Sequence, residues 1–382
     1  MLVAVPLKKT VNCLNVMQTS KYLSQVLPVL LFACLMTVSI PHVKSETQQG
    51  ANNSVDASGN EESGKLRTVP FLTLRNITGN EKASKFFGGE RSDLRAGYCE
   101  LSHTALTKLK PVAEWAPFHI PEEIVKLDAI RLSPVEEFLS DMESTVNGQS
   151  PVLYAHGFFI SFERGCKRAS LLQQSLGMKG RLVLFSWPSD GSITNYTHDE
   201  ADLYWSVDPL RGILRDMIDR FGTGKVNVVG HSLGTRGVML ALVRLAKAQQ
   251  GNEPLVNQVV LIAPDIDVGI FKQYLPVIRP LARNITVYVS SNDSPLALSR
   301  QVHGYPRLGE AGTHLEDLTG IEIIDISDIP MRAPSGHVYH LNQNIVVDDL
   351  VQLLNENRPA AQRRNLKQSG ENQWRLQQAE TE

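Results

Sequence analysis

A short motif bounded by glycines carries a serine in a position suited to nucleophilic chemistry. It reads Gly-His-Ser-Leu-Gly at residues 230–234 and lies between an apolar run, 226–229, and a helical pattern that continues downstream. A serine at a tight strand-to-helix turn needs small neighbours two residues away on either side, as Gly230 and Gly234 are. We therefore predict that Ser232 is a nucleophile; the alternative is a serine that only caps the helix.

A nucleophile that attacks a carbonyl group needs hydrogen-bond donors for the oxygen that becomes negative. The segment Tyr-Ala-His-Gly-Phe at 154–158 ends an earlier apolar run, and Gly157 allows its backbone to approach the serine closely. We expect the backbone N–H groups of Phe158 and Leu233 to form this oxyanion hole. Two nearby histidines are interpreted as structural residues: His156 and His231.

The acid that would orient a catalytic histidine is expected beyond the carboxyl end of a later strand. Asp293 follows the apolar run 285–290, and Asp265 follows the run 259–263. We favour Asp293, because the later strand is the more usual place for the acid. The alternative role for Asp265 is to cap the helix that follows it.

The general base is predicted to be His337, which follows the last apolar run, 321–326, and precedes a helical pattern. His340, further along the same segment, is the alternative. In the predicted triad, His337 accepts the proton of Ser232, while Asp293 holds the imidazole in one tautomer and stabilises its charged form.

Six short runs rich in β-branched and apolar residues are typical of parallel strands that helices cover on both faces. They are 152–155, 182–186, 226–229, 259–263, 285–290 and 321–326. Amphipathic helical patterns separate them, including 162–176 and 209–221, the second with Asp208 as its N-cap. This alternation predicts an α/β fold with a mostly parallel, doubly wound sheet. Upstream, 68–74 and 97–102 are expected to be antiparallel edge strands.

Composition and charge favour one large globular domain at about residues 66–357. Of the 382 residues, 42% are hydrophobic, and 38 Lys and Arg stand against 40 Asp and Glu, for a formal net charge of −2. Such a chain has no broad basic surface, so we expect no nucleic-acid partner. The polar segments 46–65 and 358–382 are predicted to be a flexible tether and a disordered tail.

Residues 1–45 have the pattern of a secretory signal peptide: basic, free of acidic residues, apolar in the middle and ending in the small residue Ser45. We expect cleavage there and export to the periplasm or the medium. A retained anchor or lipidation at Cys34 is the alternative, and either would be the only expected contact with a membrane. Cleavage would leave Cys99 and Cys166, hence at most one disulfide, with Cys166 expected to be a buried thiol on the core face of its helix.

Several further segments fall into a fixed order along the chain. They are Phe-Gly-Gly-Glu-Arg at 87–91, Gly-Tyr-Cys-Glu at 97–100, Ala-His-Gly-Phe at 155–158, Leu-Phe-Ser-Trp-Pro-Ser at 184–189, the serine motif, Ala-Pro-Asp at 263–265, Tyr-Val-Ser-Ser-Asn-Asp at 288–293 and Gly-His at 336–337. Their content and order resemble a bacterial α/β-hydrolase family catalogued as a domain of unknown function within the esterase/lipase superfamily. The resemblance spans about residues 66–356. It implies an α/β-hydrolase fold and a triad of Ser232, Asp293 and His337 by position, but no particular substrate.

We predict a serine hydrolase that cleaves carboxylic esters through an acyl-enzyme, with a small-molecule ester or lipid as its substrate. Two alternatives stay open: a non-catalytic scaffold that binds a ligand or partner at the cell envelope, and an acyltransferase. The sequence has no dinucleotide-binding or phosphate-binding glycine motif and no zinc-ligand spacing, so we expect neither a cofactor nor a metal. Trp187, with Tyr154, is a candidate pocket wall; alternatively, Trp187 belongs to a packed loop.

Overall fold

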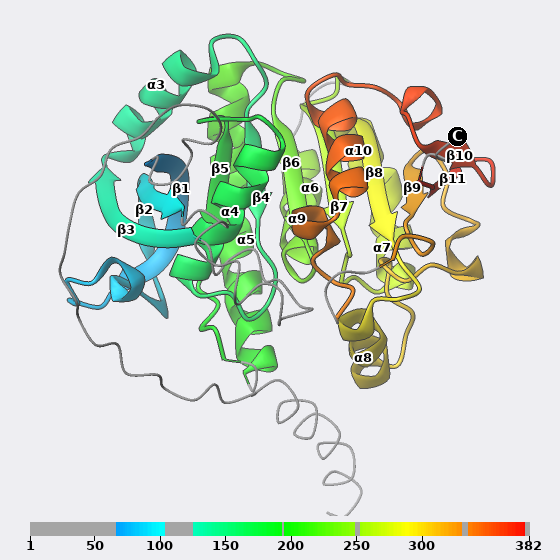
Figure 1. The fold of residues 1–382 in the computed structure, drawn as a ribbon, viewed down its shortest axis with the longest axis horizontal. Coiled ribbons are helices and arrows are strands. Elements are labelled where there is room, and N and C mark those ends of the chain that lie inside the picture. The colour runs from blue at the N-terminus through cyan, green and yellow to red at the C-terminus, as the bar shows by residue number, and fades with distance from the viewer. Residues whose placement is uncertain (1–65, 104–124, 193–194, 249–252, 331–334, 379–382) are drawn as a thin grey trace, which may run out of the picture. The chain divides into compact units, whose positions relative to one another are not determined.

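The structure, a computed structural model, describes residues 66–103, 125–192, 195–248, 253–330 and 335–378. Across these residues the chain forms an 11-stranded sheet with helices on both faces (Figure 1). The predicted signal peptide, the tether and Cys34 lie outside the described residues.

The sheet is parallel through its centre and antiparallel at both edges. Its strand order is β10-β11-β9-β8-β7-β6-β4-β5-β1-β2-β3, and the antiparallel pairs are β1 with β2, β2 with β3, and β10 with β11. The strand bounds are β1 Arg67–Ile77, β2 Phe87–His103, β3 Val125–Ser133, β4 Val152–Ala155, β5 Leu182–Ser186, β6 Asn227–His231, β7 Val256–Ile262, β8 Ala282–Val289, β9 Glu322–Asp325, β10 Leu366–Gln368 and β11 Gln373–Leu376. All six predicted parallel strands are present as β4 to β9, so the predicted doubly wound α/β sheet is confirmed.

Two apolar cores cover the two faces of the sheet. One contains the buried side chains of α3, α5, α6 and α7, and the other contains those of α4, α9 and α10. The helices are α3 Val135–Val146, α4 Phe162–Ser175, α5 Tyr196–Phe221, α6 Gly234–Ala248, α7 Val268–Ile278, α8 Ser294–His303, α9 Tyr339–Asn342 and α10 Asn344–Leu354, with 3-10 turns at η1 Ala83–Lys85, η4 Arg279–Leu281, η5 Thr313–Leu315 and η6 Ala360–Gln362. Successive residues of β4 enter opposite cores, Leu153 one and Tyr154 the other, because side chains alternate along a strand. Both faces are therefore apolar, which explains the unbroken apolar runs in the sequence.

Helix α5 begins well before its predicted start at residue 209. It runs from Tyr196 to Phe221 and contains Pro209 in its interior. Proline lacks the N–H that an interior helical position donates, and for that reason the sequence suggests a helix start there. The helix nevertheless extends upstream, because Leu203 and Val207 are buried in the same core as its second half.

The strands upstream of β4 form a wider extension than the predicted pair of edge strands. β1 and β2 are antiparallel as predicted, but β1 also pairs in parallel with β5 and β2 also pairs with β3, so both are interior strands and their prediction as edge strands is wrong. β3, which the sequence did not reveal, forms the edge. Its buried side chains are Val125 and Leu127, at its N-terminal end.

The prediction of a disordered tail is wrong for residues 358–378. This segment adds β10 and β11 to the sheet, and β11 pairs in parallel with β9. Arg363 is buried, and its guanidinium forms ion pairs with Asp349 at 2.8 Å and Glu322 at 2.7 Å. The polar composition was misleading because these polar side chains find buried partners rather than water.

Cys99 of β2 and Cys166 of α4 form a disulfide, so the expectation of a free thiol at Cys166 is wrong. Both cysteines are fully buried. The bond ties an antiparallel strand to the helix that directly follows the predicted oxyanion segment.

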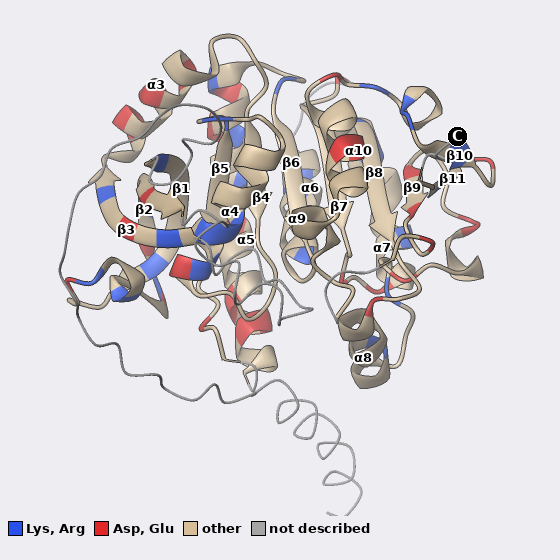
Figure 2. Cartoon of the chain, viewed as in Figure 1, with Lys and Arg blue, Asp and Glu red and all other residues tan. Residues whose placement is uncertain are grey.

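Basic and acidic residues alternate along the ribbon without separating into one basic and one acidic half (Figure 2). Basic residues near β3 and α4 have acidic partners: Lys126 pairs with Asp128, and Lys167 pairs with Glu163. Within the described part of the chain, no helix has both the length and the apolar character that crossing a membrane requires.

Candidate active site

Ser232 lies at the turn between β6 and α6 in a backbone conformation that residues other than glycine rarely adopt. Its φ is 53°, in the left-handed region, and its N–H donates to a carbonyl oxygen of β7 at 2.9 Å. A Cβ on Gly230 would lie 2.9 Å from Thr235 Cα, and one on Gly234 would clash with the carbonyl oxygen of His156. The two glycines of the motif are thus required for space, and the turn presents the serine at the carboxyl edge of the sheet.

Asp293 and His337 lie together at that edge, beyond β8 and β9. The Nδ1 atom of His337 is 2.8 Å from Oδ2 of Asp293 and 2.9 Å from Oδ1. The Asp293 side chain has no exposed surface, whereas 13% of the His337 side chain is exposed. Because a carboxylate accepts hydrogen bonds, Nδ1 is the donor in this contact, which leaves Nε2 as the acceptor nitrogen of the neutral imidazole.

His231 joins the serine turn to the segment that carries His337. Its Nε2 atom donates to the carbonyl oxygen of His337 at 3.1 Å, and the two imidazole rings lie 4.8 Å apart. His231 directly precedes Ser232, so this contact joins the segment that carries the predicted base to the serine turn. Among the described residues no hydrogen bond joins Ser232 Oγ to His337, a contact that often forms only when substrate is bound.

The predicted oxyanion donors are backbone groups that the fold leaves available. In the segment after β4, the N–H of Phe159 donates to Asp199 at 3.2 Å and that of Ile160 donates to Ser189 Oγ at 3.1 Å. The N–H groups of Phe158 and Leu233 donate to no other described residue. Because a Cβ on Gly157 would lie 2.8 Å from Ser232 Cβ, this segment approaches the serine as closely as predicted.

Asp265 belongs to a separate buried cluster and does not contact His337. Its carboxylate accepts hydrogen bonds from Arg307 Nε at 2.7 Å, Ser299 Oγ at 2.6 Å and the Tyr196 hydroxyl at 2.7 Å. Burial opposes the charge of Asp265, but the attraction of Arg307 and Arg236 outweighs it and lowers the pKa of Asp265. Nor does Asp265 cap α7, since that position is taken by Asp267.

His340 is fully buried and packs against His231. Its Nε2 atom lies 3.5 Å from the hydroxyl of Tyr154, and its ring lies 4.4 Å from that of His231. Burial, reinforced by the nearby positive charge of Arg168, holds the pKa of His340 well below its usual value. The structure therefore places Asp293 against His337 and leaves His340 a neutral packed side chain.

The candidate pocket residues Trp187 and Tyr154 are fully buried and line no open surface. Trp187 donates from Nε1 to the carbonyl oxygen of His156 at 2.8 Å, and the rings of these two residues stack at 5.0 Å. The packed-loop interpretation of Trp187 is therefore the one that the structure supports. Aromatic side chains that are partly exposed at this edge come instead from Phe158 and Tyr196, whose rings lie 5.1 Å apart.

Two charged residues that contact the oxyanion segment were not recognised in the sequence. Asp199 accepts the Phe159 N–H, and Arg75 donates to the carbonyl oxygen of Ile160 at 2.7 Å. Neither belongs to a recognisable motif. The only available signal was the position of Arg75 as a charged residue at the end of the apolar run 69–74.

One group of side chains has the composition of a cation site: Asp190, His198 and Asp199, whose ligand atoms lie within 4.8 Å of one another. These groups already have partners. Asp190 accepts the Ser192 N–H at 2.7 Å, Asp199 accepts the Ser189 hydroxyl at 2.5 Å, and His198 lies 3.3 Å from Asp202. The contacts account for the cluster without a metal ion.

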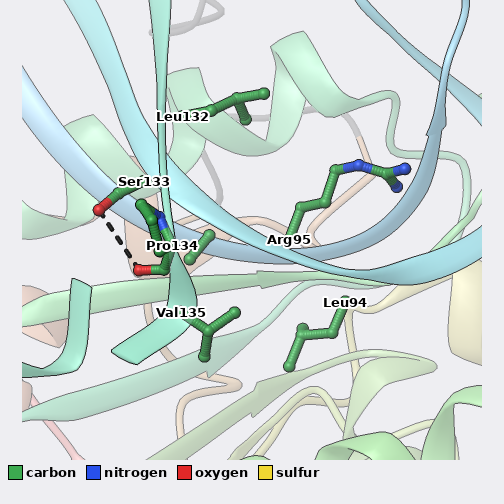
Figure 3. A pocket seen from close by; sticks show the side chains of 7 residues that line it. Leu94, Arg95, Leu132, Ser133, Pro134 and Val135 are labelled. Atoms are coloured by element: carbon green, nitrogen blue, oxygen red, sulfur yellow. Dashed lines mark hydrogen bonds between the residues drawn. The ribbon is translucent and has the colours of Figure 1, made fainter. Parts of the chain in front are cut away.

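A surface pocket at the antiparallel edge is distant from these residues. It is lined by Leu94, Arg95 and Ala96 of β2, Leu132 and Ser133 of β3, Pro134, and Val135 of α3 (Figure 3). Strands β4, β5 and β1 lie between β6 and this edge. Apart from the Arg95 guanidinium, which donates to Ser92 Oγ at 2.8 Å, the pocket has no charged group, and we assign it no role in the chemistry.

The strand order, the strained serine turn and the aspartate–histidine pair define a protein of the α/β-hydrolase class. Residues 134–358, more than half of the chain, match the family described as "Alpha/beta hydrolase of unknown function (DUF900)". The chain belongs to this family, as its motifs indicated.

The chain is also similar to solved structures at low identity. An esterase from Pyrobaculum calidifontis is 15% identical with a TM-score of 0.32, over 55% of this chain and 77% of that one. Carboxylesterase CesB from Bacillus subtilis is 11% identical with a TM-score of 0.31, over 55% and 85%. A hormone-sensitive lipase from a metagenome library is 14% identical with a TM-score of 0.33, over 66% and 97%. No curated protein matches the chain.

Proposed function

We propose that the protein is a serine hydrolase that cleaves carboxylic esters, with Ser232, Asp293 and His337 as its catalytic triad. The proposal is carried by the contact between His337 Nδ1 and the fully buried Asp293 carboxylate, at the same sheet edge as the strained serine turn. A carboxylate in this position leaves Nε2 to accept a proton, which is the requirement for activating a serine hydroxyl.

In the proposed reaction, Oγ of Ser232 attacks the carbonyl carbon of the ester while Nε2 of His337 takes the hydroxyl proton. The carbonyl oxygen becomes an oxyanion that accepts hydrogen bonds from the N–H groups of Phe158 and Leu233. The bond to the alcohol then breaks, and the alcohol leaves with the proton from His337. Water, deprotonated by the same histidine, then attacks the carbonyl carbon of the acyl-enzyme; the bond to Ser232 Oγ breaks, the acid is released, and His337 returns the proton to Oγ.

Active-site titration with a fluorophosphonate tests this function directly. One equivalent should attach to Ser232, as located by intact mass and peptide mapping, and none should attach to Ser232→Ala. His337→Ala should react far more slowly, because the hydroxyl then lacks its base. A folded wild-type protein that stays unlabelled, with and without detergent, would contradict the proposal and favour the non-catalytic scaffold.

An acyltransferase would form the same acyl-enzyme and differ only in the acceptor. Hydrolysis of p-nitrophenyl butyrate in the presence of a primary alcohol separates the two. Release of butyrate alone supports the hydrolase, whereas a butyrate ester of the alcohol as the main product supports the transferase.

Export after cleavage near Ser45 is part of the proposal. The buried disulfide between Cys99 and Cys166 supports it, since such bonds are typical of oxidising compartments. The mass of the protein recovered from cell fractions tests it. A species that begins near residue 46 outside the cytoplasm supports cleavage, a lipid adduct on Cys34 supports anchoring, and a full-length cytoplasmic species contradicts both.

A further inference from the structure

Three polar side chains from elsewhere in the fold bind the backbone of residues 156–160, the segment with the proposed oxyanion donor. Asp199 of α5 accepts the N–H of Phe159 at 3.2 Å. Ser189, in the loop after β5, accepts the N–H of Ile160 at 3.1 Å. Arg75 of β1 donates to the carbonyl oxygen of Ile160 at 2.7 Å. The N–H of Phe159 and both backbone groups of Ile160 therefore have side-chain hydrogen-bond partners.

Arg75 connects this segment to the sheet at several points. Its Nε atom donates to Ser186 Oγ at 2.8 Å, Nη1 donates to the Ser189 carbonyl oxygen at 2.5 Å, and Nη2 lies 3.4 Å from His156 Nε2. The side chain is buried, and burial lowers its pKa to about 9, so it still carries its charge at neutral pH. No described carboxylate forms an ion pair with Arg75. Burying a cation whose partners are mainly backbone oxygens costs free energy. The effect of Arg75 is to fix the positions of those backbone oxygens.

Asp199 and Ser189 form a short relay that ends on the same backbone. Ser189 Oγ donates to Asp199 Oδ2 at 2.5 Å and accepts the Ile160 N–H, so the carboxylate strengthens the second contact through the first. Phe159 has φ 63°, in the left-handed region, which costs about 1–2 kcal/mol for an L-residue. The hydrogen bond from its N–H to Asp199 offsets that strain, and the turn leaves the N–H of Phe158 as the available donor.

We propose that Arg75, Ser189 and Asp199 are positioning residues that hold segment 156–160 so that the Phe158 N–H meets the developing oxyanion. This inference rests on the proposed function. None of the three side chains touches the reacting atoms, so their effect is on the placement of a donor rather than on the triad. Misplacing a catalytic group by about 1 Å costs up to roughly 100-fold in rate.

The test compares Asp199→Asn with Asp202→Asn. Asp202 lies on the same helix, is equally buried and pairs with Arg91 at 2.6 Å, but it does not contact the oxyanion segment. Turnover of p-nitrophenyl butyrate is measured per serine titrated with fluorophosphonate, so that a misfolded fraction does not count. Asp199→Asn should lower kcat per titrated serine by about 10- to 100-fold with little change in KM, whereas Asp202→Asn should stay within about threefold of the wild type.

A trifluoromethyl ketone inhibitor supplies a readout that a merely structural role would not change. It forms an oxyanion on the serine, so its Ki should weaken in Asp199→Asn by the same factor as kcat/KM, while KM is preserved. If Asp199→Asn does not fold, Ser189→Ala, which removes a single hydroxyl, takes its place with the same expectation. Wild-type kcat per site in these variants, or an equal loss in Asp202→Asn, would overturn the inference. Absence of labelling in the wild type would instead defeat the proposed function itself.

Discussion

Replacing Asp293 by asparagine tests which carboxylate serves His337. The Asp293 carboxylate is fully buried and lies 2.8 and 2.9 Å from Nδ1 of that histidine. Asparagine keeps the shape, but its NH₂ group favours the tautomer in which Nε2 is protonated, and that nitrogen can then no longer accept the serine proton. In serine proteases the same change lowers kcat about 10⁴-fold. We expect a similar loss here, which corresponds to about 5 kcal/mol of transition-state stabilisation.

Asp293→Asn should affect folding little, so a loss of turnover in this variant reports directly on catalysis. Asp293 also caps α8 by accepting the Leu296 N–H at 3.1 Å, and asparagine caps helices as well as aspartate does. The matched control is Asp265→Asn, which weakens a buried ion pair with Arg307 and should lower stability by up to about 3–5 kcal/mol. Its kcat for p-nitrophenyl butyrate, per folded protein by circular dichroism, should nevertheless stay within about threefold of the wild type. Equal losses of turnover in the two variants, or full turnover in Asp293→Asn, would contradict the assignment of Asp293 as the acid.

The alternative base and the stability of the fold can be tested with further variants. His340→Asn should retain most turnover per titrated serine, because that side chain contacts no carboxylate in the described structure; a complete loss would reassign the base. Replacing both Cys99 and Cys166 by alanine should lower the free energy of unfolding, measured by urea denaturation, by about 4 kcal/mol, because the disulfide closes a loop of 67 residues in the unfolded chain. A chain ended at residue 357 leaves Asp349 buried without its guanidinium partner and should lose about 3–5 kcal/mol or become insoluble. Burial raises the pKa of Asp349 from 3.8 to about 6. The contribution of this residue to stability is therefore fully present below pH 4 and is lost as the pH rises through 6. The free energy of unfolding, relative to that of Asp349→Asn, should fall by about 3 kcal/mol over that range.

Sequence-based prediction succeeded where a local pattern reports directly on burial. The runs 152–155 and 182–186 coincide with β4 and β5, because strands covered on both faces are continuously apolar. It failed where distant packing overrides a local signal. Pro209 suggested a helix start, yet buried side chains upstream carry α5 through it, and the polar C-terminal residues 358–378 join the sheet through β11.

Some residues of the candidate site were likewise predictable from local patterns, and others were not. The serine turn is predictable from the sequence alone, because the need for glycine at 230 and 234 is a local steric requirement within five residues of chain. It also restricted the acid and the base to two candidates each, since both must follow later parallel strands.

Three features of the site follow from the folded chain and not from any local pattern: Asp293 rather than Asp265 meets His337, Trp187 is packed rather than lining a pocket, and Asp199 contacts the oxyanion segment. These partners are far apart in the sequence. Their contacts depend on the register of neighbouring strands and on where buried charges find counter-charges, and no local pattern in the sequence encodes either.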